Sequence, residues 1–153
     1  MRQKQVYQKD GPEGFQRAIG KPFGRARRRE TLMMQGGMMM KILNYGSMNI
    51  DHVYAVPRMV TPGETLIAED KQLFCGGKGL NQSVAIARAG GRVFHAGVVG
   101  EDGGMLCDAL TDAGVDIRHV RRRAGASCET VIQVDAHGQN SIIVYNNPAL
   151  RLQ

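Results

Sequence analysis

The sequence lacks the long apolar segments that membrane insertion and secretion require. No apolar run approaches the roughly 20 residues that cross a bilayer, and the first 30 residues contain no apolar stretch of the secretory type. Tryptophan is absent, and the three cysteines form no Cys-x-x-Cys pair, so neither a disulfide framework nor a zinc site is indicated. We therefore expect a cytoplasmic globular protein with no membrane partner and no metal site of its own.

Excess charge is missing from most of the chain. The 153 residues suffice for one modest domain. The net charge of +6 lies in residues 1–40, which hold nine Lys or Arg and three acidic residues, whereas residues 41–153 hold eleven of each. The folded part of the chain therefore carries no charge signature of a nucleic-acid partner.

Residues 1–40 show no sustained helical or strand periodicity, because Gly and Pro interrupt them repeatedly. We interpret them as a disordered basic extension. Three methionines at 38–40 directly precede the first strand-like segment, as they would if the native protein began there and the extension were no part of it. The basic run at 25–29 is interpreted as solvated, and phosphate contacts by this arm are the alternative.

Strand and helix patterns alternate after residue 40. Short apolar runs predict strands at 41–46 and 92–99, and apolar residues at helical spacing predict helices at 81–89 and 105–113. This order is typical of right-handed crossovers in a parallel sheet with flanking helices. The fold class is therefore α/β.

A second, smaller sheet is also predicted. Residues 130–135 and 141–145 flank a polar, Gly-containing turn, as in a β-hairpin. Residues 51–74 contain short, partly alternating pieces around Pro57 and a Thr-Pro-Gly turn. Because an antiparallel hairpin does not belong inside a parallel sheet, we expect these segments to form a small antiparallel sheet of their own.

A glycine-rich segment at 76–79 (Gly-Gly-Lys-Gly) is the first candidate site. It does not fit a P-loop, because Gln72 replaces the first glycine and Gly79 follows the lysine, and it lacks the last glycine of a dinucleotide fingerprint. A flexible loop remains, with Lys78 and Asn81 as polar groups and a backbone that can approach a ligand closely. Such a loop suits a neutral polyol.

The second candidate follows the first predicted strand, where Gly46 begins the string Gly-Ser-Met-Asn-Ile-Asp. Ligands of open parallel sheets bind beyond the carboxyl ends of the strands, which is where Asn49 and Asp51 lie. A carboxylate and an amide together can bind vicinal hydroxyls. A simple turn stabilised by Asn and Asp is the alternative.

These motifs resemble the ribokinase-like (phosphofructokinase-B type) carbohydrate kinases. The string Gly-Gly-Lys-Gly-Leu-Asn-Gln-Ser at 76–83, with Gly90 and Gly100 after it, resembles a signature of that family. The strings at 46–51 and 61–65 (Thr-Pro-Gly-Glu-Thr) resemble the ribokinase branch. The resemblance covers about residues 41–145, in order and without large gaps.

The resemblance implies a fold, a site and cofactors. Residues 41–153 would be the N-terminal portion of a ribokinase-like kinase domain with an incomplete parallel sheet. Strands near 51–74 and 128–145 would form a lid over the sugar and a homodimer surface. ATP and Mg²⁺ would be used, with binding sites mostly outside this chain. The implied sugar-binding residues are Asn49, Asp51, Gly77, Lys78 and Asn81.

The resemblance also shows what the chain lacks. The family places its catalytic base in a Gly-Ala-Gly-Asp string, and no Gly-x-Gly-Asp occurs in this sequence. No catalytic residue is therefore assigned. We expect the sugar-binding half of a kinase that phosphorylates a sugar, with ribose favoured, and no activity from this chain alone. A non-catalytic sugar-binding or pairing module is the alternative.

Two further segments have structural interpretations. His95 lies in a predicted strand and is expected to be packed or hydrogen-bonded. The three arginines at 121–123 are interpreted as a solvated connector into the hairpin.

Overall fold

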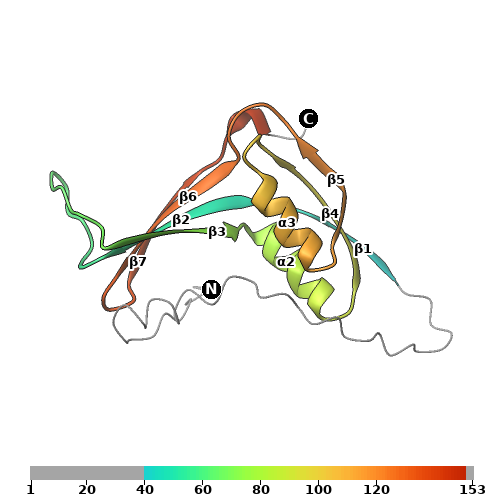
Figure 1. Cartoon of the computed structure of the whole chain (residues 1–153), viewed down its shortest axis with the longest axis horizontal. Coiled ribbons are helices and arrows are strands. Elements are labelled where there is room, and N and C mark those ends of the chain that lie inside the picture. The colour runs from blue at the N-terminus through green and yellow to red at the C-terminus, as the bar shows by residue number, and fades with distance from the viewer. Residues whose placement is uncertain (1–39, 151–153) are drawn as a thin grey trace. The chain divides into compact units, whose positions relative to one another are not determined.

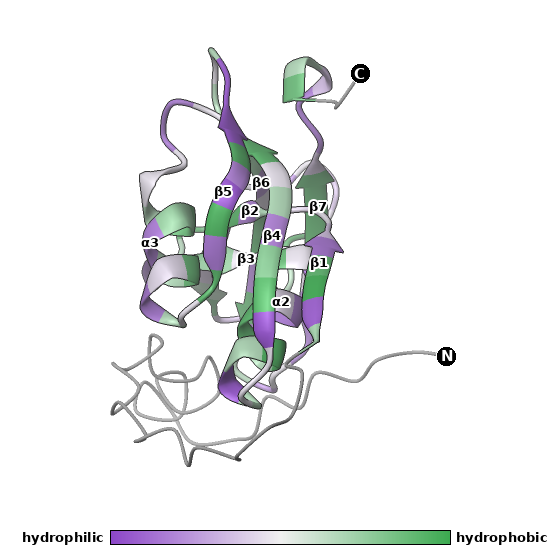
Figure 2. Cartoon of the chain, turned by 90° about the vertical axis from the view of Figure 1, so that its right-hand side faces the viewer, coloured by the Kyte–Doolittle hydropathy of each residue, from purple (hydrophilic) through white to green (hydrophobic). Residues whose placement is uncertain are grey.

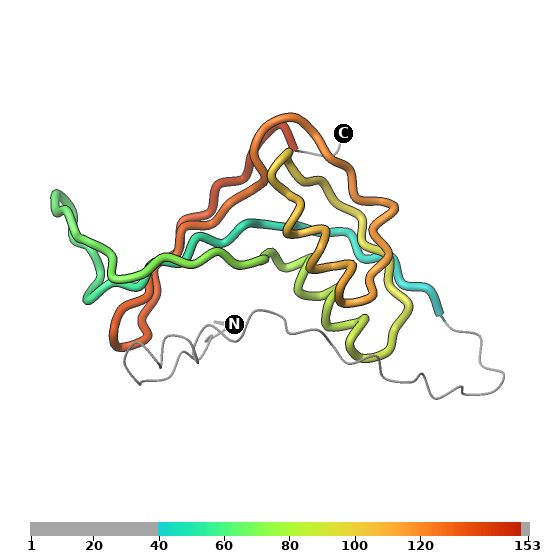
Figure 3. The backbone as a smooth tube through the Cα atoms, in the orientation of Figure 1, coloured from blue at the N-terminus to red at the C-terminus, as the bar shows by residue number. Residues whose placement is uncertain are grey.

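The computed structural model describes residues 40–150, so residues 1–39 of the predicted disordered extension, with the first two of the three methionines proposed as start sites, lie outside the described residues. This part of the chain divides into two compact units. The core unit comprises residues 40–50, Cys75–Glu129 and 145–150, and the sheet unit comprises Asp51–Phe74 and Thr130–Val144. Each unit is thus assembled from separate stretches of sequence, whose path can be followed in Figure 3.

A three-stranded parallel sheet forms the centre of the core unit. Its strands are β1 (Lys41–Tyr45), β4 (Arg92–Val99) and β5 (Asp116–Arg122), in the order β1-β4-β5. The register pairs Ile42 with Val93 and Val98 with Arg121. Parallel neighbours require crossover connections, and the two helices of the core unit lie in these connections.

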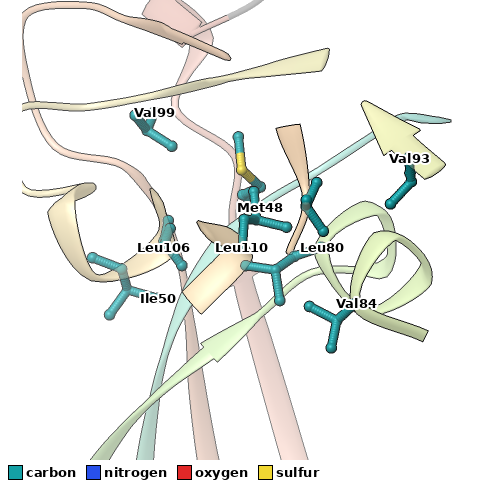
Figure 4. Close-up of a cluster of buried hydrophobic side chains, with 9 residues drawn as sticks. Met48, Ile50, Leu80, Val84, Val93, Val99, Leu106 and Leu110 are labelled. Carbon is teal, nitrogen blue, oxygen red and sulfur yellow. The ribbon is translucent and has the colours of Figure 1, made fainter. Parts of the chain in front are cut away.

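Helices α2 (Lys78–Arg88) and α3 (Gly104–Asp112) pack on the same face of this sheet (Figure 1). Every second residue of β4 points to that face and is buried, in agreement with the period of a strand. The apolar side chains of the helices and strands form one cluster (Figure 4): Met48, Ile50, Leu80, Val84, Val93, Val99, Leu106, Leu110 and Val115. No helix in residues 40–150 has the length and apolarity needed to cross a membrane.

The opposite face of the core sheet carries apolar side chains, and no helix within residues 40–150 covers it; Figure 2 views the strands from this side. Leu43 and Tyr45 of β1 are 64% and 66% exposed. On β4 the matching residues Phe94 and Ala96 are only partly buried. Arg92 and Arg118 both place their guanidinium groups over the Phe94 ring, at 5.8 and 5.4 Å from its centroid.

The sheet unit is built on four strands in the order β3-β2-β6-β7. They are β2 (Asn49–Val56), β3 (Asp70–Gly76), β6 (Cys128–Asp135) and β7 (Asn140–Tyr145), and the sheet is mixed. The predicted hairpin joins β6 to β7, with the amide of Asp135 donating to the Gln139 carbonyl. Its small apolar cluster consists of Phe74, Val53, Ile132 and Val134.

The Thr-Pro-Gly-Glu string at 61–64 forms a turn in the sheet unit. The Glu64 carboxylate accepts hydrogen bonds from the backbone amide and the hydroxyl of Thr61, and it pairs with the Arg58 guanidinium. These bonds lower the pKa of Glu64 to about 2, the one to Arg58 having the largest effect. The motif therefore has a local structural role, since it closes its own turn.

Two expectations need correction. Helix α2 begins at Lys78, three residues before the predicted start at 81, and it therefore includes Gly79. Residues 116–122 form β5, so Arg121 and Arg122 lie in a strand of the parallel sheet rather than in a connector. The strand was missed because β5 is an edge strand with mostly exposed, charged side chains, which gives no apolar run to detect.

Candidate functional site

The two sequence motifs meet through their glycines in the core unit. The segment after β1 and the first turn of α2 approach so closely that a Cβ atom on Gly79 would lie 2.5 Å from the carbonyl carbon of Gly46. Such a distance is far below van der Waals contact. Across this contact, the Leu80 amide donates a hydrogen bond to the Ser47 carbonyl oxygen at 3.1 Å. The loop after β1 and the start of α2 therefore form one backbone platform.

Gly77 is required for a second reason. It caps the N-terminus of α2 with φ +98°, a conformation that favours glycine. A Cβ atom there would also lie 2.5 Å from the Ser47 carbonyl oxygen. The sequence of this loop is therefore explained by backbone geometry before any ligand is considered.

The platform carries three of the predicted polar residues. Asn49 is 8% exposed at the start of β2, whereas Lys78 and Asn81, in the first turn of α2, are exposed to solvent. The backbone of Asn81 is fixed by a hydrogen bond from its amide to the Gly77 carbonyl at 3.0 Å. A buried amide, an ammonium group and an exposed amide are suitable partners for a neutral polyhydroxyl compound, which both donates and accepts hydrogen bonds.

The fifth predicted residue, Asp51, belongs to the sheet unit. It lies two residues beyond Asn49 on β2, and its half-buried carboxylate accepts a hydrogen bond from Thr130 on β6. Burial raises the pKa of Asp51 above its ordinary value, and the Thr130 hydrogen bond and the nearby His52 act in the opposite direction. A carboxylate that is partly removed from water is stabilised when hydroxyl groups donate hydrogen bonds to it.

Sequence reasoning missed the residues that support these groups. Thr130 hydrogen-bonds Asp51, and Asn44 and Ser83 hydrogen-bond one another below the glycine platform. No local pattern could reveal them, because each pair is distant in sequence. His95 is buried and hydrogen-bonded to Ser83, which confirms its interpretation as a packed residue.

No group of three or more His, Cys, Asp or Glu in the described part of the chain could hold a metal ion. The Cys75 thiol donates a hydrogen bond to the Met105 carbonyl oxygen at 3.3 Å.

Comparison with known proteins agrees with this architecture. Residues 39–153 match the sequence profile described as pfkB family carbohydrate kinase. The ribokinase of Haemophilus influenzae is 38% identical over 65% of this chain and 33% of its own length. The ribokinase of Staphylococcus aureus is 37% identical, over 69% of this chain and 36% of its own length.

The chain is also similar in structure to solved ribokinases. A ribokinase from Cryptococcus neoformans in complex with ADP has a TM-score of 0.62 and 39% identity, over 69% of this chain and 34% of that chain. Arabidopsis thaliana ribokinase complexed with ribose and ATP has a TM-score of 0.62 and 32% identity, over 71% of this chain and 36% of that one.

The fold and the glycine platform thus define a sugar-kinase type of domain, and the chain belongs to the pfkB family of carbohydrate kinases. Within that family, ribokinases are among its similar relatives, and the fold is ribokinase-like. The chain spans about a third of the length of the curated relatives it matches.

Proposed function

We propose that this chain is the sugar-binding part of a kinase that transfers the γ-phosphoryl group of ATP to a hydroxyl of ribose. The observation that carries the proposal is the Gly46–Gly79 backbone contact, because it joins the segment that leads to Asn49 to the first turn of α2, where Lys78 and Asn81 are exposed. Gly77 would offer backbone to the same sugar, and Asp51 would accept hydrogen bonds from its hydroxyls. The similarity to ribokinases favours ribose as the sugar.

The complete reaction needs groups that this chain does not offer. Phosphoryl transfer requires a base for the sugar hydroxyl, a bound nucleotide and stabilisation of charge on the phosphoryl oxygens. The sequence contains no Gly-x-Gly-Asp string. The aligned part of the chain covers about a third of the length of its relatives. We propose that this chain alone binds the sugar and does not phosphorylate it, and that ATP and Mg²⁺ would be bound mostly by residues outside this chain.

A non-catalytic pairing module is the second candidate. Ile142, Ile143 and Val144 of the edge strand β7 are 48%, 64% and 52% exposed, as expected for a strand that pairs with another chain. This candidate and the kinase differ in what adjoins the chain. A neighbouring reading frame that encodes Gly-x-Gly-Asp would support the kinase, and its absence would favour the module.

Titration calorimetry tests the proposed binding. The purified chain is titrated with ribose, fructose and adenosine, beside an Asp51→Ala variant whose fold is checked by circular dichroism. We expect heat of binding with ribose that exceeds the heats with the other two, and loss of at least about tenfold in affinity in the variant, since hydrogen bonds to charged groups contribute about 1.5–3 kcal/mol. A folded parent chain that binds none of the three compounds contradicts the proposal.

A coupled ADP assay tests the expected lack of turnover. The chain is incubated with ribose, ATP and Mg²⁺, and an active ribokinase serves as the positive control. Ribose-dependent ADP formation that co-purifies with this chain would show that the missing catalytic groups are present after all.

A further inference from the structure

Three polar side chains, two of them buried and one partly buried, form a hydrogen-bond network beside the glycine platform. Asn44 comes from β1, Ser83 from α2 and His95 from β4, all within the core unit. Ser83 and His95 are 0% exposed. Because buried polar groups are costly unless they are hydrogen-bonded, the arrangement of donors and acceptors in this network is tightly constrained.

The direction of the first two hydrogen bonds follows from chemistry. The side chain of Asn44 lies 2.8 Å from the Gly79 carbonyl oxygen, which can only accept, so the atom that faces it must be the amide nitrogen. The same nitrogen has a second hydrogen and donates it to the Ser83 hydroxyl oxygen, also at 2.8 Å. Asn44 thereby ties β1 to two residues of α2, Gly79 and Ser83.

The third hydrogen bond joins the Ser83 hydroxyl to His95 Nδ1 at 2.8 Å. The hydroxyl accepts from Asn44, and we assign its one hydrogen to His95 Nδ1. An accepting Nδ1 places the ring proton on Nε2. Burial lowers the pKa of His95, and its weaker interaction with the Gly46 backbone opposes this change. In the described residues Nε2 has no other hydrogen-bond partner of good geometry.

The network therefore reaches both sides of the backbone contact. It bonds Gly79 through Asn44, and it ends beside Gly46 through His95. We propose that Asn44, Ser83 and His95 are positioning residues that hold the Gly46–Gly79 contact in the geometry needed to bind the sugar. The inference rests on the proposed function for its ligand, but the geometry of the contact can be tested without one.

A pair of serine variants provides the test. Ser83→Ala removes the central hydroxyl, and Ser127→Ala is the matched control. Ser127 is also buried in the core unit, at 2% exposure, and its hydroxyl accepts a hydrogen bond from the Gly100 amide at 2.9 Å. Both variants lose one buried hydroxyl, so a purely structural role predicts similar behaviour.

Amide hydrogen exchange at Leu80 is the first measurement, because this amide bonds Ser47 across the contact. After correction for each variant's global unfolding, we expect exchange about tenfold faster in Ser83→Ala and unchanged in Ser127→Ala, the factor of one hydrogen bond of ordinary strength. Ribose titrations of the same samples are expected to show a comparable loss of affinity in Ser83→Ala alone.

The outcomes separate this inference from the proposed function. If the parent chain binds no ribose but exchange at Leu80 responds only to Ser83→Ala, the proposed ligand is wrong and the network still positions the loop. If ribose binds and the two serine variants behave alike in exchange and affinity, the positioning role is wrong.

Nitrogen-15 spectra of the parent chain keep the inference testable should Ser83→Ala not fold. They report the tautomer of His95 directly. A neutral ring protonated on Nε2 at neutral pH is expected, and a ring protonated on Nδ1 overturns the assigned hydrogen-bond directions and the proposal with them.

Discussion

Gly46 and Gly79 are in direct backbone contact: a Cβ atom on Gly46 would lie 2.7 Å from the Cα atom of Gly79. Neither position tolerates a side chain unless the loop and the helix move apart. The contact explains why glycines occur in two motifs that are separated in sequence but adjacent in the core unit. It also leads to the most direct mutational prediction.

Gly79→Ala is expected to push the loop after β1 away from α2 and to weaken ribose binding. Overpacking of this kind costs about 1–3 kcal/mol in the free energy of unfolding. Gly104→Ala is the matched control in the first turn of α3, since a Cβ atom there meets nothing within 4 Å. It is expected to be neutral or stabilising by up to about 1 kcal/mol. Denaturant unfolding and ribose titration measure both effects, and equal losses in the two variants would contradict the contact.

Asp51→Asn is expected to stabilise the chain while it weakens sugar binding. The pKa of Asp51 is raised in the fold, so the native state holds its proton more firmly than the unfolded state does. Stability from this group is therefore lost as the pH rises from 3.8 through the native pKa, and the ionised form remains a cost at neutral pH. Unfolding measured at pH 7 should show a more stable variant.

Exposed Asp108 on α3 supplies the control for that variant. Asp108→Asn removes the same charge and should leave ribose binding unchanged. If Asp51→Asn binds ribose as the parent does, Asp51 is not a sugar ligand. If the Asp51→Asn variant is less stable than the parent at neutral pH, the fold stabilises the Asp51 carboxylate of the parent, and burial does not destabilise it.

His95 is expected to make the stability of the chain fall in mild acid. Its pKa is lowered in the fold, so the unfolded state gains a proton near the ordinary value of 6.5 while the native state stays neutral. The contribution of neutral His95 is present above that pH and is lost as the pH falls through it towards the native pKa. The stability advantage of the parent over His95→Asn should therefore shrink between about pH 7 and about pH 5. An advantage that is constant or grows over this range contradicts the lowered pKa.

If two copies of the chain pair through β7, the Ile143→Lys substitution is expected to favour the monomer. The edge strand is exposed along its length, and a lysine there would place charge in the interface. Leu43→Lys is the matched control, since Leu43 and Ile143 are both 64% exposed and lie in different units. Analytical ultracentrifugation should show dissociation of the dimer in Ile143→Lys alone. Dissociation in Leu43→Lys instead would assign association to the face of the core sheet that carries Leu43.

Periodic patterns predicted the elements that have a strong apolar face. The strand at β4, the helix at α3 and the hairpin of β6 and β7 were all located from short windows of sequence. β5 was not, since only Ile117 and Val120 of this strand pack on the apolar core and its other side chains are polar or charged. The early start of α2 was also missed, because glycine has a low helix propensity and no local pattern shows that Gly79 packs against Gly46.

The sequence by itself determined the alternation of strands and helices, the polar residues available to a ligand and the resemblance to a kinase family, since each is encoded in local spacing. Only the tertiary structure decided which backbone segments touch, that Asn44, Ser83 and His95 share one hydrogen-bond network, and that Thr130 solvates Asp51. These relations join residues on different elements, and folding alone brings them within hydrogen-bonding distance.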